Sequence, residues 1–175
     1  MCEISAIVEP CGSPAPGIAE LYIGEVKNIS AIPAATITVG DADEWEITTA
    51  ITMVATKKFK KIEFEMYSGS VEDDMKDGMS GGFNKSLKFR LKKMNPKANA
   101  WISNAIGTRV VALAVDNNGQ VILLGSIQQP LMVKAGKGST GAKDGDKHGW
   151  DIELTGLSAN ASYFYTAAMP AFDAV

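Results

Sequence analysis

Two stretches of the chain alternate between apolar and mainly charged residues: Lys61-Ile-Glu-Phe-Glu-Met-Tyr67 and Ser86-Leu-Lys-Phe-Arg-Leu-Lys92. A period of two is typical of a half-buried β-strand, because successive side chains point to opposite faces of a sheet. Each stretch therefore predicts a strand with one face in a core. The predicted core residues are Ile62, Phe64 and Met66 in the first strand and Leu87, Phe89 and Leu91 in the second.

The outward faces of these two predicted strands carry charges that are mostly of opposite sign. Antiparallel pairing would place these side chains opposite one another, and each favourable pair would contribute about 0.2–1 kcal/mol. We therefore expect the two strands to pair. The outward residues are Lys61, Glu63 and Glu65 in the first strand and Lys88, Arg90 and Lys92 in the second.

The segment between the two predicted strands, residues 68–85, is far longer than a hairpin turn requires. Long loops in compact domains are usually either functional or disordered. We expect this segment to be an extended loop that reaches a neighbouring subunit.

The composition is that of a globular protein that folds as one domain over residues 1–175. The chain is 46% hydrophobic and 21% charged, and this length can bury a large core without disulfides. No apolar run reaches the roughly 20 residues that cross a bilayer. The first residues lack the features of a signal peptide, so we expect synthesis in a cytoplasm and no membrane. Cys2 and Cys11 are interpreted as free thiols, too few for a zinc site.

Charge is distributed unevenly along the chain. Residues 57–97 hold 11 Lys and Arg against 6 Asp and Glu, whereas the net charge of the whole chain is −3. A basic segment beside an acidic remainder suits head-to-tail contact between identical copies. Random clustering of solvated surface charges is the alternative explanation.

Short runs of β-branched and aromatic residues, separated by turn-forming residues, fill most of the remaining chain. Asp116-Asn-Asn-Gly119 is the clearest hairpin turn, because Asn-Gly accepts the positive φ angles of a tight turn. A polar, glycine-rich loop is expected over residues 136–149. The further predicted strands are residues 4–8 (or an arm), 21–26, 35–39, 47–55, 109–115, 120–126, 131–135, 150–154 and 163–166.

One short helix is predicted after residue 95. Asn95 is a suitable N-cap and Pro96 suits the first helical position. Gly107 is a suitable C-cap. The apolar stripe expected to face the core consists of Ala98, Trp101, Ile102, Ala105 and Ile106. Many strands, one helix and no βαβ repetition predict a mainly β fold, an antiparallel sandwich or barrel with one flanking helix.

The sequence offers few residues for catalysis. His148 is the only histidine and stands in the glycine-rich loop, so we interpret it as a surface residue. Gly136, Gly138 and Gly141 match the letters of a dinucleotide fingerprint, but the residues after them do not start the helix that this motif requires. We therefore expect no cofactor, no catalytic residue and no enzymatic activity.

Three acidic groups are candidate cation sites: Asp41-Ala-Asp-Glu44, Glu72-Asp-Asp74 and Asp144-Gly-Asp146. The first and third do not continue into the twelve-residue calcium loop that ends in a bidentate Glu. Acidic runs on loops are usually solvated, so no metal site is predicted.

The order of these elements resembles virion structural proteins of tailed phages. The likeness is greatest to tail tube proteins, in particular those of phages that infect Bacteroides-type bacteria. It covers most of the chain as an arrangement of elements more than as a motif. The residues that carry it are Gly17-Ile-Ala-Glu-Leu-Tyr-Ile23, the long-looped strand pair around residues 65–89, the helix with Ala100 and Trp101, residues 111–124, and Gly149-Trp-Asp-Ile-Glu-Leu-Thr-Gly156.

The resemblance implies a sandwich or barrel whose copies form hexameric rings, which stack into a tube that conducts DNA out of the capsid. The partners would be copies of the chain, other tail proteins and passing double-stranded DNA. The location would be the virion. Loop 68–85, the N-terminal arm 1–17 and the C-terminal tail 167–175 would contact neighbouring subunits, and the glycines would let the loop bend. The expected contact residues are Ser70, Val71, Met75, Gly78, Met79, Gly81, Gly82 and Phe83 in the loop, and Ile4, Ile7, Phe172 and Val175 in the termini.

A tube that conducts DNA should present few cations inward, because cations would hold the phosphates. We therefore expect Lys88, Arg90 and Lys92 to point away from any lumen. Two alternatives remain open. The chain could be another virion component, such as a connector, terminator or head decoration protein, or a ligand-binding β-sandwich module.

Overall fold

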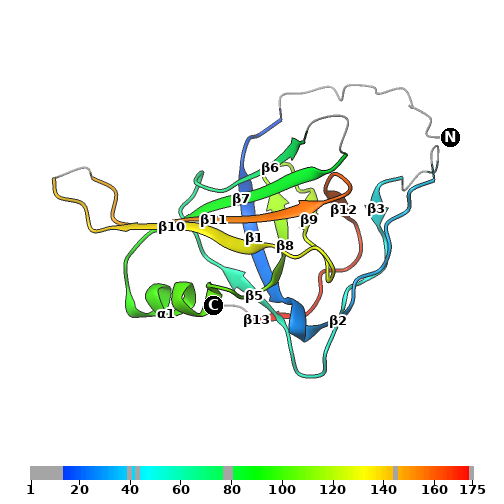
Figure 1. Cartoon of the computed structure of the whole chain (residues 1–175), viewed down its shortest axis with the longest axis horizontal. Helices are drawn as coiled ribbons and strands as arrows, with labels where there is room; N and C mark the ends of the chain where they lie inside the picture. The colour runs from blue at the N-terminus through cyan, green and yellow to red at the C-terminus, as the bar shows by residue number, and fades with distance from the viewer. Residues whose placement is uncertain (1–13, 39–40, 42–43, 77–80, 144–145, 174–175) are drawn as a thin grey trace.

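The computed structural model describes residues 14–38, 41, 44–76, 81–143 and 146–173. The fold is mainly β with one α-helix, as predicted (Figure 1). The elements are β1 Ile18–Glu25, the 3₁₀ turn Val26–Asn28, β2 Ile29–Ala31, β3 Glu46–Ile47, β4 Thr52–Met53, β5 Phe59–Ile62, β6 Ser70–Met75, β7 Phe83–Leu91, α1 Pro96–Ala105, β8 Val110–Asp116, β9 Val121–Leu124, β10 Met132–Ser139, β11 Gly149–Ser158, β12 Tyr163–Tyr165 and β13 Phe172–Asp173.

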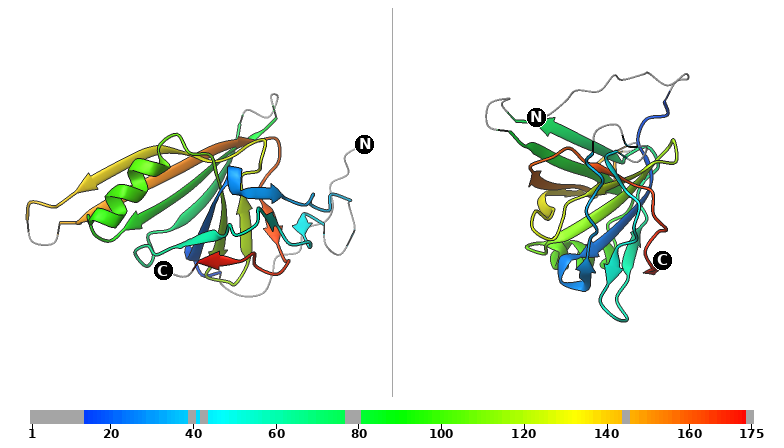
Figure 2. Two further views of the ribbon diagram at one scale, coloured as in Figure 1. Left: turned by 90° about the horizontal axis from the view of Figure 1, so that it is seen from below. Right: turned by 90° about the vertical axis from the view of Figure 1, so that its right-hand side faces the viewer.

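Two sheets form the body of a sandwich-like fold (Figures 1 and 2). The larger sheet has seven strands in the order β13-β5-β1-β8-β9-β12-β3, and the smaller has four in the order β10-β11-β7-β6. All pairings are antiparallel except β12 with β3 and β13 with β5. Strands β2 and β4 form a separate two-stranded sheet.

Two hydrophobic clusters cover the two faces of the seven-stranded sheet. One lies between the sheets and joins Leu21 and Ala112 to Leu87 and Leu154 of the four-stranded sheet. The other lies on the opposite face, where segments between the strands cover residues such as Leu113. Burial on both faces explains why β8 reads Val-Val-Ala-Leu-Ala without alternation.

Helix α1 begins as predicted and packs on the four-stranded sheet. The Asn95 side chain accepts a hydrogen bond from the Ala98 amide at 2.7 Å, which satisfies one free donor of the first turn. Trp101 meets Phe89 edge to face, with ring centroids 6.0 Å apart. The predicted stripe is wrong at its end, because the helix stops at Ala105 and leaves Ile106 exposed.

The turn between β8 and β9 is also confirmed. The Asp116 carboxylate accepts hydrogen bonds from the amides of Asn118 and Gln120, at 2.9 and 2.7 Å. Gly119 has a φ of +86°, which a side chain would disfavour.

The predicted pairing of the two alternating stretches is wrong. Only the start of the first stretch is a strand, β5, and it pairs with β1 in the seven-stranded sheet. Strand β7 pairs instead with β6 and β11 in the four-stranded sheet. Between β5 and β6 the chain crosses from one sheet to the other through a turn at Met66 and Tyr67, so Met66 is 74% exposed rather than buried. Leu87 and Phe89 are buried as predicted.

Residues 68–85 are not a loop throughout, contrary to the prediction. Residues 70–75 form β6, which pairs with β7 of the same chain from Ser70 opposite Lys88 to Met75 opposite Phe83. The sequence does not predict this strand because it contains three consecutive acidic residues, and Asp and Glu have low β propensity. The glycine-rich segment 136–149 is likewise strand at its start, since β10 continues to Ser139.

Several other predicted strands are shorter or absent. Residues 35–38 contain no strand, and residues 47–55 contribute only the second residue of β3 and the two residues of β4. Ile47 and Ile51 are nevertheless buried in the second hydrophobic cluster. Their apolar character reflects this covering role and not membership of a long strand.

Candidate assembly edges of the four-stranded sheet

Both edges of the four-stranded sheet are open within the described part of the chain. β6 is paired only with β7, and β10 is paired only with β11. β6 is exposed from Glu72 to Met75, and β10 is exposed at every residue except Val133. An open edge presents unpaired backbone N–H and C=O groups that can pair with another chain.

The two open edges carry opposite charge. β6 contains Glu72, Asp73 and Asp74, whereas β10 contains Lys134 and Lys137 and no acidic residue. Contact between the β6 edge of one copy and the β10 edge of another therefore brings unlike charges together, foremost Asp74 and Lys137, because Glu72 and Lys134 also form ion pairs within their own chain. Two β6 edges, or two β10 edges, would repel each other.

The strand directions also permit head-to-tail contact. Every neighbouring pair in the four-stranded sheet is antiparallel. β6 consequently runs opposite to β10, and the β10 edge of a next copy could extend the sheet with the same alternation of directions. The edges of the seven-stranded sheet are β13 and β3, each of two residues, which offer little for strand addition.

The charged side chains on the outer face of the four-stranded sheet are largely paired. Lys88 contacts Glu72 at 2.6 Å, and Lys134 contacts Glu153 at 3.0 Å. The hydrogen bond from Lys88 lowers the pKa of the Glu72 carboxyl, and the same bond raises the pKa of Lys88. This face is therefore polar with few uncompensated cations.

Arg90 connects the four-stranded sheet to the crossover before β6. Its side chain is only 6% exposed, with Nε 3.1 Å from a Glu65 oxygen and Nη1 3.1 Å from an Asp151 oxygen. Its backbone carbonyl accepts from the Glu65 amide at 2.8 Å, and its amide donates to the Ser68 hydroxyl at 3.2 Å. The predicted attraction between the two alternating stretches thus exists at one pair, although the strands do not pair.

Replacing Arg90 should loosen this crossover. We expect Arg90→Met to lower the free energy of unfolding by about 1–3 kcal/mol, because charge-assisted hydrogen bonds are lost while the freed carboxylates stay hydrated. Hydrogen exchange should rise at residues 65–68 more than at the β8–β9 hairpin. Lys88→Met, on the same face but with its ammonium in solvent, is the control and should change stability much less than Arg90→Met. An equal effect of the two substitutions would contradict the assigned role of Arg90.

The predicted contact residues separate into four groups. Ser70, Val71 and Met75 lie on β6, where Val71 packs against the core and Met75 is exposed. Phe83 begins β7, after Gly81 and Gly82, whose φ angles of +59° and +126° favour glycine. Phe172 pairs with Phe59 of its own chain and contacts Tyr22, at a centroid distance of 4.9 Å. Ile4, Ile7, Gly78, Met79 and Val175 lie outside the described residues.

The sequence predicts only the first part of β10, as a strand over residues 131–135. Lys137 falls in the predicted loop because Gly136 and Gly138 flank it, and the spacing of three between Lys134 and Lys137 does not give the alternation of a strand. Gly138 is in contact distance of Trp150 on β11, where a Cβ would approach the indole to 2.9 Å. The glycine therefore reflects close packing within a strand pair.

His148 and parts of the three acidic groups lie within the described residues. His148 is exposed, and no group of three or more His, Cys, Asp or Glu in the described ranges could hold a metal ion. Asp43 and Asp144, from two of the acidic groups considered, lie outside those ranges. No described helix has the length and apolar character to span a bilayer.

Comparison with protein-family models, curated proteins and solved structures finds no match to this chain.

Proposed function

We propose that this chain is a structural subunit that joins copies of itself head to tail through the β6 and β10 edges. The observation that carries the proposal is the presence of two exposed edges, opposite in charge and in strand direction, on one four-stranded sheet. A contact between different surfaces of identical copies generates a ring where the rotation closes, and a filament where it does not.

The specific assembly that we propose is the tail tube of a tailed phage, built from stacked rings. The subunit would be made in the host cytoplasm and reside in the virion, with other tail proteins at the ends of the tube. Pairing of Lys88 and Arg90 with carboxylates supports passage of DNA, since few free cations would hold its phosphates.

Assembly can be tested with the purified full-length protein. Sedimentation velocity and negative-stain microscopy over a rising concentration series should show rings, and stacks of rings at the highest concentration. A monomer at every concentration, with no particles larger than a single subunit, would contradict the proposal. Closed rings that never stack would favour another virion component, such as a connector, over a tail tube.

A further inference from the structure

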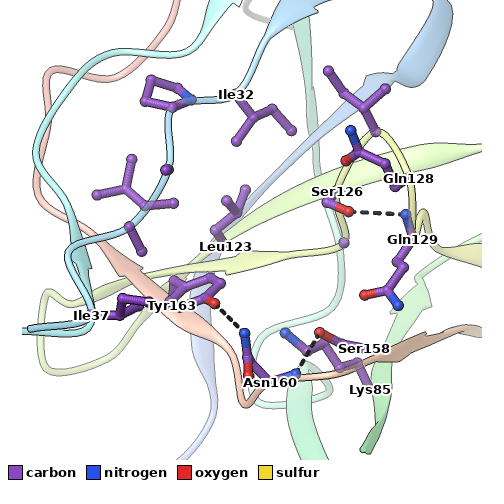
Figure 3. A pocket seen from close by; sticks show the side chains of 16 residues that line it. Ile32, Ile37, Lys85, Leu123, Ser126, Gln128, Gln129, Ser158, Asn160 and Tyr163 are labelled. Atoms are coloured by element: carbon purple, nitrogen blue, oxygen red, sulfur yellow. Dashed lines mark hydrogen bonds between the residues drawn. The ribbon is translucent and has the colours of Figure 1, made fainter.

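A pocket of about 350 Å³ lies where three connecting segments meet at one end of the sandwich. Residues 32–37 form one wall, the turn 125–129 a second, and the segment 158–163 a third. Figure 3 shows Ile32, Ile37 and Leu123 on its apolar side and polar side chains on the other. Ligand pockets commonly have volumes of roughly 300–1,000 Å³ with a few polar groups in a mainly apolar lining.

The charged group of this pocket is Lys85, which is only 3% exposed. Lys85 follows the inward row of β7, two residues before buried Leu87, so its side chain points between the sheets. Its Nζ lies 5.9 Å from the centroid of the Tyr163 ring. Lysine is rarely buried unless it is paired, because removing an ammonium from water is costly.

The acidic residue opposite Lys85 forms its hydrogen bonds with a different residue. Asp73 stands opposite Lys85 on β6, but its two carboxylate oxygens accept hydrogen bonds from the amide and hydroxyl of Ser162, at 2.6 and 2.9 Å. Among the described residues no carboxylate lies within ion-pair distance of the Lys85 ammonium. Burial lowers the pKa of Lys85, and the negative charge of Asp73, which lies beyond ion-pair distance, opposes this shift.

Neutral hydrogen-bonding side chains line the same pocket as Lys85. The Tyr163 hydroxyl accepts from Asn160 at 2.7 Å and keeps its own proton to donate. The Gln129 side-chain oxygen accepts from the Ala159 amide at 3.3 Å, which leaves the Gln129 NH₂ group as a donor. Both side chains line the pocket.

We propose that this pocket binds a small aliphatic monocarboxylate. The carboxylate would lie beside the Lys85 ammonium, and the hydrocarbon chain would lie against Ile32, Ile37 and Leu123. One negative charge matches the one cation that lines the pocket, whereas a dianion such as phosphate would also meet the neighbouring charge of Asp73. The apolar wall favours a hydrocarbon chain over a sugar or another fully polar ligand.

Equilibrium dialysis of the full-length protein against radiolabelled hexanoate tests this site, because the readout does not depend on whether copies associate. We expect saturable binding with one site per chain. Unlabelled hexan-1-ol should compete at least about tenfold more weakly than unlabelled hexanoate, since a hydrogen bond to a charged group is absent. Inorganic phosphate should not compete.

Two matched variants assign the binding to Lys85. Lys85→Met keeps the side-chain length and should abolish the preference for hexanoate over hexan-1-ol, whereas Lys88→Met, on the outer face of the same strand, should leave it unchanged. Equal competition by the two compounds, absence of saturable binding, or an unchanged preference in Lys85→Met would overturn the proposal. Failure of this site would leave the assembly test unaffected.

The free energy of unfolding, measured as a function of pH, shows whether Lys85→Met still folds. It also shows whether burial of the Lys85 ammonium destabilises the wild-type protein. The pKa of Lys85 is lowered in the folded state, so the unfolded chain holds more protons between the folded and unfolded values. Wild-type stability should therefore gain from this group as the pH rises through that interval. Lys85→Met should be at least as stable as wild type at neutral pH, and its advantage should shrink at alkaline pH.

Discussion

Reversing the charge of one open edge is expected to abolish assembly. The variant Lys134→Glu/Lys137→Glu carries an acidic β10 edge that must face the acidic β6 edge of the next copy. The variant Glu72→Lys/Asp74→Lys carries a net basic β6 edge that must face a basic β10 edge. Opposed like charges destabilise strand pairs by amounts similar to those by which unlike charges stabilise them, about 0.2–1 kcal/mol each.

The effect on a ring is larger than the effect on one contact. In a closed head-to-tail ring every copy contributes one β6 edge and one β10 edge, so each junction suffers the same loss. Sedimentation velocity should therefore show monomer for both double variants at concentrations where the wild type assembles. High salt should partly restore assembly, because exposed charges are screened beyond about 10 Å at 0.1 M ionic strength.

An equal mixture of the two double variants should assemble again. The acidic β10 edge of the first variant faces the basic β6 edge of the second, and the two native edges also meet with opposite sign. Only alternating arrangements satisfy both junctions, so the particles should contain the two chains in equal amounts. This can be measured by mass spectrometry of the purified particles.

A control variant tests whether the change in net charge alone could explain these results. Lys27→Glu/Lys57→Glu changes the net charge by the same amount as the β10 variant, at exposed positions outside the four-stranded sheet and outside α1, which contacts β10, and should assemble normally. Loss of the exposed contacts of Glu72 with Lys88 and of Lys134 with Glu153 should change the stability of each monomer little, which thermal unfolding can check. Failure of the mixture to assemble, or failure of the control variant, would refute the edge contact.

Features set by neighbouring residues were predictable from the sequence. Asn95 and Pro96 marked the start of α1, and Asp116-Asn-Asn-Gly119 marked the β8–β9 turn, because caps and turns satisfy backbone groups within a few residues. The doubly buried β8 was recognisable from its continuous apolar run. The sandwich class followed from the number of such strands.

Features set by distant residues were not predictable in the same way. Alternation in residues 61–67 identified a strand, but not which sheet it joins, and the crossover at Met66 separates it from β7. β6 is held by backbone pairing with β7 despite its acidic residues. The open β10 edge and the burial of Lys85 depend on the order of strands in space, so the sequence alone does not predict either feature.

The largest change in monomer stability is expected at Phe59 and Gly24. Phe59 is 0% exposed and lies on β5, in the cluster that covers the outer face of the seven-stranded sheet. Its ring lies over Gly24 of β1, where an added Cβ would approach Cε1 to 2.8 Å. We expect Phe59→Ala to lower the free energy of unfolding by about 3–5 kcal/mol, since the cavity adds to the lost transfer energy.

Gly24→Ala should destabilise the protein for the opposite reason, by about 1–3 kcal/mol, because the new methyl group overpacks the ring. In the double variant that methyl group occupies part of the space left by the ring. The combined loss in denaturant unfolding should therefore be smaller than the sum of the single losses, by about 0.5–3 kcal/mol.

Gly136→Ala is the matched control for this cycle, because a Cβ there has no atom within 4 Å. Its effect should be small and should add to that of Phe59→Ala without coupling, since the two sites share no contact. Strict additivity of Gly24→Ala with Phe59→Ala would show that the strands adjust to the extra methyl group. Coupling would show that the close approach of β5 to β1 requires a glycine at position 24.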